Sequence, residues 1–416
     1  MQNYDIRDLA LAPSGHTKID WVKENMPVLA GLEQEFRKTR PLEGIRISLS
    51  VHLEAKTAYL CKVLAAGGAE MSVTGSNVLS TQDDVAAALA EDGLRVFAVH
   101  GESEESYYRH IRMTLENGPQ IIIDDGGDLV SMLHTEMQHL IPGVYGGCEE
   151  TTTGVIRLRA MEREGVLAFP MVAVNDAKCK HMFDNRYGTG QSVWESIMHN
   201  TNLIVASKTV VVAGYGWCGK GVALRAAALG ARVIVTETDP VKAVEAKMDG
   251  YDVMTMEEAA RAGDMFVTVT GCEHVITGDH MLAMKDNAIL ANAGHFNVEI
   301  DMEWLENHAE EKKVSRENIM GYRLSNGRRV HVLAEGRLVN IAASNGHPAE
   351  IMDMSFAVQA LSALYVLRHH GELPNGVIDV SDQIDEMVAQ RKLAAWGIEI
   401  DRLTEEQEKY LSSWNL

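Results

Sequence analysis

The chain has 416 residues, 46% of them hydrophobic, which is enough for two or three domains with buried cores. Its 59 acidic residues outnumber its 38 basic ones and give a formal net charge of -21 at pH 7, so nucleic acid and anionic membranes are poor candidates for partners. The N-terminus lacks the basic and apolar regions of a signal peptide, and no uninterrupted apolar run approaches the length of a membrane span. We therefore expect a soluble protein of the cytoplasm.

The cysteines are consistent with a reducing compartment. They are odd in number, scattered, and without a C-x-x-C pair: Cys61, Cys148, Cys179, Cys218 and Cys272. This pattern predicts reduced thiols rather than disulfides or a zinc site, and we assign no metal ligands.

The first half of the chain alternates short apolar runs with helical patterns. The runs lie at 44–53, 70–77, 94–101 and 120–128. Helical patterns at 57–68 and 81–93 follow the first two runs. Such alternation is typical of an α/β layer with a parallel sheet.

The first run ends in three polar side chains spaced two apart, His52, Glu54 and Lys56. On a strand, residues at this spacing line one face, so the three would share one pocket. A solvated strand edge followed by an ordinary helix start explains the same residues, and the stretch 49–60 taken alone favours that explanation.

Carboxylates gather after the later runs. Asp124, Asp125 and Asp128 follow an apolar run, where ligands bind in open α/β sheets. They can accept a proton or hold a metal, or one can cap a helix while the others are solvated. The segment 149–153, two glutamates and three threonines, suits either sugar hydroxyls or a helix N-terminus.

A lysine and carboxylate cluster comes next. Lys178, Lys180, Asp184 and Asn185 fall within eight residues. A partly desolvated lysine beside a carboxylate can move protons, although a surface ion pair is more common. Glycines then precede an amphipathic helical pattern within 183–201, and we expect this segment to be a hinge.

A second α/β series starts near residue 208 with a glycine-rich motif. Gly214, Gly216 and Gly219 follow a β-branched run and precede a helical pattern, the arrangement in which a helix N-terminus faces a pyrophosphate. Glu237 ends the next run, where a carboxylate can accept both ribose hydroxyls, so NAD is favoured over NADP. Lys242 is interpreted as a solvated helix residue.

Two glycine–histidine pairs lie in this second series, at His295 and His347. Together with a dinucleotide site they suggest a polar cleft between two domains. After Pro348 the pattern becomes helical, and the chain ends in a charged segment, 403–416.

Taken together, these segments resemble the S-adenosylhomocysteine hydrolase family along nearly the whole chain. The matching motifs are HLEAKTA, STQDDVAAA, DDGGDL, EETTTGV, FDNRYGTGQS, VVAGYGWCGKG, NAGHFNVEID, LAEGRLVN and NGHP. The resemblance implies two Rossmann-like doubly wound domains, bound NAD, a short C-terminal helical segment and a homotetramer. We place the substrate domain at 1–184, completed by 348–390, the NAD domain at 185–347, and a subunit contact at 391–416.

The reaction implied is reversible hydrolysis of a nucleoside–homocysteine thioether. Oxidation at C3′ makes the C4′ proton acidic, the thiolate leaves from C5′, water adds, and C3′ is reduced again. By matching motif, Lys180 and Asp184 resemble the pair that handles the 3′-hydroxyl proton, and Asp125 the residue that assists at C4′. His52 is expected near the sulfur and the entering water, and His295 on the cofactor side of the cleft.

Binding contacts are implied in the same way. Glu150 resembles the carboxylate that binds ribose hydroxyls, Asn185 its neighbour near the nicotinamide, and His347 part of the segment that closes over the purine. The other cofactor contacts expected are Thr151, Thr152, Thr153, Thr270 and Asn340, besides Gly214, Gly216, Gly219 and Glu237.

The chain departs from the family pattern in three places. Thr189 replaces a cysteine common after D-N-x-Y-G, and the end lacks the lysine- and tyrosine-bearing tail of many members. Glu54 and Lys56 stand where many members have threonine and glutamate, which address the N1 and N6 edge of the purine. A glutamate and a lysine suit N1–H and O6 of hypoxanthine, so we expect S-inosylhomocysteine as a good or preferred substrate.

Three alternatives stay open. Glu54 and Lys56 can pair with each other while adenine is accepted through water, which makes the protein a strict S-adenosylhomocysteine hydrolase. A simple NAD dehydrogenase would reduce external NAD stoichiometrically. A catalytically silent NAD-binding regulator would lack Asp125, Lys180 or His52, and all three are present.

Overall fold

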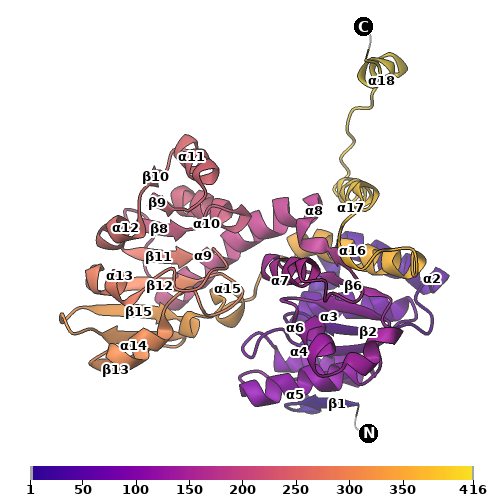
Figure 1. Cartoon of the computed structure of the whole chain (residues 1–416), viewed down its shortest axis with the longest axis horizontal. Coiled ribbons are helices and arrows are strands. Elements are labelled where there is room, and N and C mark those ends of the chain that lie inside the picture. Colours follow the sequence, from indigo (N-terminus) through magenta and orange to yellow (C-terminus); the bar gives the residue numbers. More distant parts are fainter. Residues whose placement is uncertain (1–2, 415–416) are drawn as a thin grey trace.

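The computed structural model describes residues 3–414 and shows two α/β bodies side by side, with a C-terminal arm that leaves the molecule (Figure 1). Each body is built on one eight-stranded sheet. The α/β class expected from the alternating pattern is confirmed.

The strands of the first sheet are all parallel, in the order β1-β4-β3-β2-β5-β6-β7-β16. Their bounds are β1 Tyr4–Ile6, β2 Arg46–Ser50, β3 Glu70–Thr74, β4 Arg95–Ala98, β5 Ile121–Asp124, β6 Gly146–Glu149, β7 Pro170–Ala173 and β16 Gly376–Asp379. Ser50, Asp124 and Glu149 are in register at the carboxyl ends of β2, β5 and β6. The loops that follow these residues therefore leave from one edge of the sheet.

The second sheet has the order β10-β9-β8-β11-β12-β15-β14-β13. Its strands are β8 Thr209–Ala213, β9 Arg232–Thr236, β10 Asp252–Val253, β11 Met265–Thr268, β12 Ala288–Asn292, β13 Glu311–Arg316, β14 Ile319–Arg323 and β15 Arg329–Leu333. The first six strands in the order are parallel, whereas β14 runs antiparallel to both β15 and β13. A parallel α/β sheet with antiparallel strands at one edge is a common variant of this architecture.

Helices cover both sheets and connect the bodies. The first body carries α1 Ala12–Glu24, α2 Pro27–Thr39, α3 Ala55–Ala66, α4 Asp83–Glu91, α5 Glu104–Leu115, α6 Asp128–Thr135, α7 Thr152–Arg163, α8 Lys178–Lys180, α16 Ala349–Arg368 and α17 Asp382–Ala395. The second carries α9 Thr189–Thr201, α10 Trp217–Ala228, α11 Pro240–Met248, α12 Met256–Ala262, α13 Gly278–Ala283, α14 Met302–His308 and α15 Val339–Ala342, and α18 Glu405–Ser412 lies in the arm. Short helical segments are η1 Leu9–Leu11, η2 Gln138–Gly143, η3 Val174–Asp176, η4 His181–Gly188 and η5 Ala334–Gly336.

One expectation about the first run is wrong. Strand β2 ends at Ser50, and Ala55 already begins α3, so His52, Glu54 and Lys56 do not share the face of a strand. Glu54 is the N-cap of α3, because its side chain accepts a hydrogen bond from the Lys56 N–H. Both residues are only 6% exposed, so the solvated strand edge is wrong as well.

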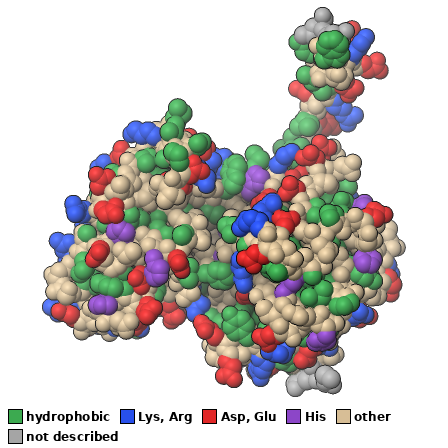
Figure 2. Space-filling view, in the orientation of Figure 1, with side chains coloured by type: hydrophobic (Ala, Val, Ile, Leu, Met, Phe, Trp, Pro, Cys, Tyr) green, Lys and Arg blue, Asp and Glu red, His purple; other side chains and the backbone are tan. Residues whose placement is uncertain are grey.

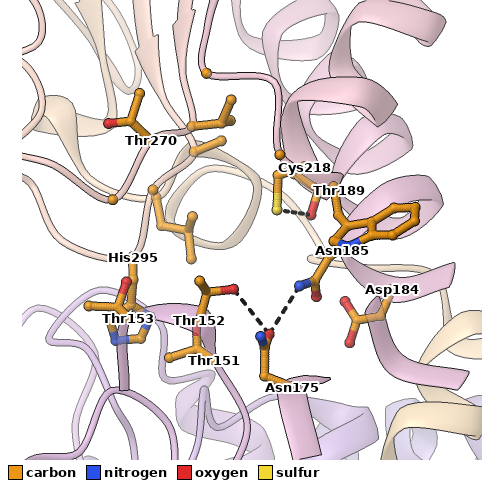
Figure 3. A pocket seen from close by; sticks show the side chains of 18 of the residues that line it. Thr151, Thr152, Thr153, Asn175, Asp184, Asn185, Thr189, Cys218, Thr270 and His295 are labelled. Carbon is orange, nitrogen blue, oxygen red and sulfur yellow. Dashed lines mark hydrogen bonds between the residues drawn. The ribbon is translucent and has the colours of Figure 1, made fainter. Parts of the chain in front are cut away.

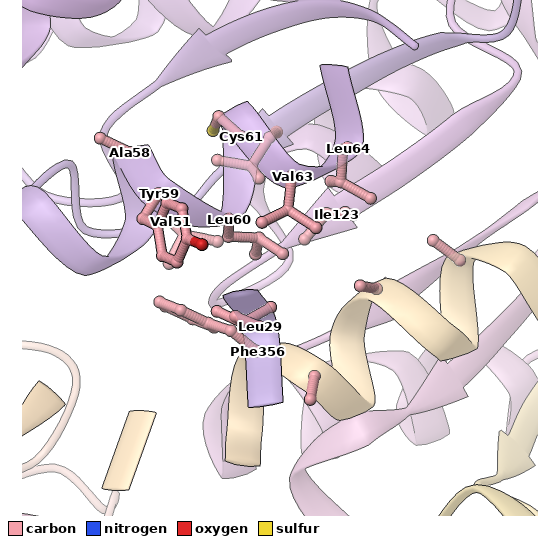
Figure 4. Packing of buried hydrophobic residues seen from close by; sticks show 14 of the residues in the cluster. Leu29, Val51, Ala58, Tyr59, Leu60, Cys61, Val63, Leu64, Ile123 and Phe356 are labelled. Carbon is pink, nitrogen blue, oxygen red and sulfur yellow. The ribbon is translucent and has the colours of Figure 1, made fainter. Parts of the chain in front are cut away.

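Helix α16 lies in the core of the first body although it comes late in the chain. Phe356 packs among residues of the first quarter of the chain, including Leu29, Val51 and Leu60 (Figure 4). The helix is long and apolar enough to cross a membrane by length and composition, but 78% of its most apolar stretch is buried inside the protein. Since β16 also pairs with β7, the chain crosses from the first body to the second and returns.

Candidate active site

A cavity of about 1090 Å³ lies between the two bodies. The loops after β2, β5 and β6 line one side of it, and the loops after β8, β9 and β11 line the other. Every residue to which the family resemblance assigned a catalytic or binding role lines this cavity except Gly219. Gly219 instead lies under the glycine-rich turn, where a Cβ would meet the Gly214 carbonyl oxygen at 2.0 Å.

Lys180 is buried at the point where the chain passes from one body to the other. The segment His181–Gly188 after it is a π-helix, a form that is rare and concentrated at functional sites. Its wide turn places both the fourth and the fifth following residue beside Lys180, with Nζ 3.2 Å from Asp184 Oδ2 and 2.7 Å from Asn185 Oδ1. The segment expected to be a hinge thus begins at a densely hydrogen-bonded corner of the cavity, and its role as a hinge stays a prediction.

Asp184 is held by three groups from three parts of the chain. Besides Lys180, His347 Nδ1 lies 2.5 Å from Oδ1, and the Ser355 hydroxyl donates to Oδ2 at 2.8 Å. Burial alone would raise the pKa of Asp184, but Lys180 and His347 hold it far below its usual value. The opposite balance keeps Lys180 charged, because Asp184 and Glu150 outweigh its desolvation and raise its pKa.

Glu150 completes this cluster from the first sheet. Its Oε1 lies 3.5 Å from Lys180 Nζ, and Gln359 donates to Oε2 at 2.5 Å. Burial raises the pKa of Glu150 to about 7, since Lys180 compensates only part of the desolvation.

A second polar cluster surrounds Asp125 at the end of β5. His52 Nε2 lies 3.5 Å from Asp125 Oδ2, and His295 Nδ1 lies 3.8 Å from Oδ1. Burial lowers the pKa of His52 to about 4 although Asp125 opposes that shift. Within residues 3–414, these three side chains also bring ligand atoms within 4.8 Å of one another, a set that could hold a metal ion. Our expectation of no metal stays a prediction.

Glu54 and Lys56 form a buried ion pair at the wall of the cavity. Their side-chain atoms Oε2 and Nζ are 2.7 Å apart, and Nζ also donates to the Asn345 carbonyl at 3.0 Å. The segment that carries Asn345 also carries His347, so the pair joins the start of α3 to the return crossing of the chain.

The glycine-rich turn after β8 has the geometry of a phosphate site. Gly214 has a φ of 100°, which a residue with a side chain rarely adopts. A Cβ on Gly216 would meet nothing within 4 Å, so its backbone borders open space at the start of α10. Glu237 accepts the N–H groups of Tyr215, Thr238 and Asp239 at the end of β9. These residues fit a dinucleotide whose pyrophosphate lies over the turn and whose ribose faces Glu237.

Threonines and amides from both bodies meet around the middle of the cavity (Figure 3). Thr152 Oγ1 donates to Asn175 Oδ1 at 3.2 Å, and Asn185 Nδ2 donates to the same oxygen at 3.0 Å. Thr189, which replaces the family cysteine, donates to Cys218 Sγ at 3.6 Å, so a thiol of a different residue adjoins this position.

Not every carboxylate singled out in the sequence lies at the cavity. Asp124 is fully buried and caps the turn after β5, accepting from the Asp125 and Val130 N–H groups. Asp128 pairs with Arg157, and Lys178 pairs with Asp382 on the surface. Asp124 and Asp128 are therefore structural neighbours of Asp125 and do not line the cavity.

Several residues of the site carried no local signal in the sequence. Ser355 and Gln359 lie one turn apart on α16, and Met352 and Phe356 line the cavity from the same helix. Ser76 contacts both His52 and Asp125. All of them act on partners that are distant in the sequence, so only the packing of α16 and of the loop after β3 reveals them.

Comparisons with known proteins decide the family. A sequence model of the S-adenosyl-L-homocysteine hydrolase family matches residues 3–142, and a model of that family's NAD-binding domain matches residues 185–346. An adenosylhomocysteinase of Aquifex aeolicus is 58% identical over 414 residues, with 99% of each chain covered. The chain belongs to the S-adenosyl-L-homocysteine hydrolase family.

Relatives with two different names are almost equally similar to this family member. The S-inosyl-L-homocysteine hydrolase of Methanocaldococcus jannaschii is 54% identical, with 99% of each chain covered. That of Methanopyrus kandleri is 55% identical, covering 99% of this chain and 97% of the relative. The expectations of a hydrolase and of NAD as its cofactor are confirmed by the family. The alternatives of a simple dehydrogenase and of a silent regulator lose their support.

Proposed function

We propose that this protein hydrolyses S-inosyl-L-homocysteine in preference to S-adenosyl-L-homocysteine, using bound NAD catalytically. One observation carries the proposal: a single cavity joins a dinucleotide turn, two separate proton-transfer clusters and a buried Glu54–Lys56 pair. A thioether on C5′ leaves readily only when C3′ is a ketone, so a hydrolase of this kind needs both redox and acid–base groups in one space.

Lys180 and Asp184 are assigned to the 3′-hydroxyl. When bound, NAD⁺ supplies the acceptor for the C3′ hydride and returns that hydride at the end of the cycle. Lys180 Nζ donates to Asn185 and faces Asp184, so the buried Lys–Asp pair is placed to handle the hydroxyl proton. Because its carboxylate neighbours keep Lys180 charged, Lys180 can accept that proton only after it has passed on one of its own. Glu150 is assigned to the neighbouring ribose hydroxyls, because its carboxyl faces the same ammonium.

Asp125 and His52 are assigned to the C4′ and C5′ positions. Asp125 would assist transfer of the C4′ proton once C3′ is a ketone, and His52 would act on the departing sulfur and the entering water. His295 borders both residues and is assigned to the cofactor side of this cluster. The Lys180–Asp184 cluster is thus assigned to the redox steps at C3′, and the His52–Asp125 cluster to the loss of the thiolate and the addition of water.

The remaining cavity residues are assigned to binding. Thr151, Thr152, Thr153, Thr270, Asn185 and Asn340 are proposed to contact the nicotinamide half of the cofactor, and Gly214, Gly216 and Glu237 the adenosine half. His347 is proposed to close over the purine, since it joins Asp184 from the return crossing.

The purine preference rests on hydrogen-bond chemistry. Hypoxanthine presents N1–H and O6, which match a carboxylate acceptor and an ammonium donor. Adenine presents an N1 acceptor and an amino donor, so it satisfies the same pair only with Lys56 on N1 and Glu54 on the amino group. In a buried site, a mismatched edge leaves polar groups on both sides without partners, which discriminates strongly.

A thiol-release assay on one preparation tests the proposal. We expect kcat/KM for S-inosylhomocysteine to exceed that for S-adenosylhomocysteine by at least about tenfold, with no net NADH. A higher value for the adenosyl compound would mean that the pair reads adenine in the reversed order. Accumulation of NADH without thiol would instead indicate a dehydrogenase.

Exchanging the pair provides the matched control. The double variant Glu54→Thr with Lys56→Glu should shift the ratio of the two kcat/KM values toward adenine by about tenfold or more, because a hydroxyl and a carboxylate suit the adenine edge. An unchanged ratio would show that these side chains do not select the base.

We also propose the assembly and the division of the chain. The substrate domain comprises 1–184 and 348–390, the NAD domain comprises 185–347, and 391–416 makes contacts in a cytoplasmic homotetramer. Residues 1–2 and 415–416 lie outside the described part. In support, the arm exposes large apolar side chains, among them Ile400, Leu411 and Trp414 (Figure 2).

A further inference from the structure

Ser76 lies in the loop after β3 and connects two members of the second cluster. Its side chain is buried, with 4% of the residue exposed. Its Oγ lies 3.0 Å from His52 Nδ1 and 2.9 Å from Asp125 Oδ2. We propose that Ser76 is a positioning residue that holds His52 as the Nδ1–H tautomer, so that the lone pair of Nε2 is available as a base.

The argument follows from counting protons. A serine hydroxyl has one proton, and an ionised carboxylate can only accept. The Ser76 O–H therefore donates to Asp125, and its contact with His52 is attractive only if Nδ1–H donates to Oγ. A neutral imidazole has a single N–H, so Nε2 is left with its lone pair.

The electrostatics of the cluster agree with these protonation states. Burial lowers the pKa of His52 to about 4, so its imidazole is neutral at neutral pH. Burial would raise the pKa of Asp125, but His52, His295 and the Ser76 hydroxyl hold it below its ordinary value, so this carboxyl is ionised.

The position of Asp125 gives this tautomer a chemical use. His52 Nε2 lies 3.5 Å from Asp125 Oδ2, beyond a good hydrogen bond but close enough to pair once Nε2 takes up a proton. Asp125 can thus stabilise the imidazolium that forms when His52 removes a proton from water. Without Ser76, an Nε2–H directed at Asp125 would be the better-bonded tautomer, and the base would be lost.

The kinetic meaning of this inference rests on the proposed function. Ser76 adjoins only the His52 and Asp125 cluster, whereas Ser355 bonds Asp184 in the other cluster. Loss of the two hydroxyls should therefore affect different halves of the reaction. Ser80 offers a matched control, because it is buried in the same loop but donates only to the Asn77 carbonyl.

NMR of the full-length protein labelled with ¹⁵N in histidine tests the tautomer directly. We expect His52, assigned with a His52→Gln variant, to show Nδ1–H in the wild type, in Ser80→Ala and in Ser76→Thr, which retains a hydroxyl. Ser76→Ala should convert it largely to Nε2–H. An Nε2–H tautomer in the wild type would overturn the inference, and so would an unchanged tautomer in Ser76→Ala. The wild-type measurement remains decisive even if the Ser76→Ala variant does not fold.

Kinetics of the holoenzyme separate this inference from the proposed function. Ser76→Ala should slow thiol release by about tenfold to a hundredfold with little change in KM, while the rate of NADH formation on mixing with the nucleoside stays at the wild-type value. Ser355→Ala should instead slow NADH formation. Equal slowing of both phases in Ser76→Ala would show a merely structural role. Absence of thiol release in the wild type would contradict the proposed function and leave the tautomer result standing.

Discussion

Single carboxyl groups of this site differ in what they do because their partners differ. Asp125 and Asp184 are held below their ordinary pKa by cationic and hydroxyl neighbours, whereas Glu149 lies one strand away with its pKa raised well above the ordinary value by burial and by Asp124. Glu149 Oε1 accepts the N–H groups of Gly126 and Thr151, and Oε2 is buried without a hydrogen-bond partner among residues 3–414. Glu149 therefore joins the loop after β5 to the loop after β6 through hydrogen bonds, and its function does not depend on a charge.

This assignment predicts opposite results for two substitutions of Glu149. Glu149→Gln keeps an oxygen for both N–H groups, so it should retain the fold. A carboxyl with a raised pKa contributes stability below its unfolded pKa of about 4.5 and loses it as the pH rises. The melting temperature of Glu149→Gln should therefore exceed that of the wild type more at pH 8 than at pH 5.

Glu149→Leu is the matched control for that change. It removes the acceptor and leaves two buried N–H groups unpaired, which should cost about 1–3 kcal/mol for each group at either pH. Thermal unfolding of the three proteins at pH 5 and pH 8 measures both effects. A gap between Glu149→Gln and the wild type that narrows at pH 8 would contradict the assignment.

Residue types and short spacings could be read from the sequence, whereas partners from distant segments could not. The motif around Lys180 places its lysine, aspartate and asparagine together because they are neighbours in the chain. The spacing gave no sign that a π-helix would bring positions 184 and 185 to the same ammonium. Ser76, Ser355 and Gln359 meet their carboxylates only through tertiary packing, for which no local pattern exists.

Two elements depend on each other at the boundary between the bodies. The π-helix that carries Asp184 and Asn185 packs against α10, the helix that starts at the dinucleotide turn. The contact is too close for a side chain, because a Cβ on Gly221 would lie 1.7 Å from the Arg186 carbonyl oxygen. The start of α9, directly after the π-helix, is equally close, since a Cβ on Gly190 would lie 2.5 Å from the Gly221 carbonyl oxygen. This close packing sets the spacing between the groups proposed for proton transfer and those proposed to bind the cofactor.

Gly221→Ala should disturb both sites at once. The added methyl group must push α10 away from the π-helix, and overpacking of this kind costs about 1–3 kcal/mol. We expect at least about tenfold weaker NAD binding and a lower melting temperature, measured by fluorescence titration and by thermal unfolding. Unaltered NAD affinity would show that the two elements are independent.

Gly31→Ala is the control in another helix. A Cβ at Gly31 meets nothing within 4 Å, so this change should leave NAD binding unaltered and stabilise α2 by up to about 1 kcal/mol.

The strands and the fold class of the whole molecule followed from alternating apolar runs and helical patterns, because that periodicity reports the local burial of each element. Strand ends were less predictable. The first run continued in sequence past Ser50, but the chain turns there so that Glu54 can cap α3. The antiparallel pairing of β14 was not predicted either, since pairing is decided between segments and not within one.

The described part of the C-terminal arm exposes several large apolar side chains. Tyr410, Leu411 and Trp414 are 60%, 68% and 94% exposed. A cluster of large exposed apolar side chains is unusual on the surface of a monomer and is typical of a protein–protein contact. If the proposed tetramer forms through this arm, ending the chain after Gly397 should reduce it to one or two chains without lowering the melting temperature of each body. Light scattering on the eluting protein measures the mass, and a mass unchanged by the deletion would contradict the proposed contact.

A point variant separates loss of the arm from loss of its apolar side chains. Leu411→Glu should give the same smaller assembly, because it places a charge in the proposed contact. Met248→Glu on α11, which changes another apolar side chain that is 83% exposed, should not.

The two crossings of the chain decide when the first body can fold. Its N-terminal strands and helices are synthesised before the second body, but Phe356 and the rest of α16 complete their core only about 160 residues later. Until then the ribosome-bound chain exposes the apolar surface that α16 will cover, while the second body is contiguous and free to fold first. Domains made from separated segments are therefore exposed to chaperones and to aggregation during synthesis for longer than contiguous ones. The order of folding in this enzyme is expected to be the reverse of the order of its two halves along the chain.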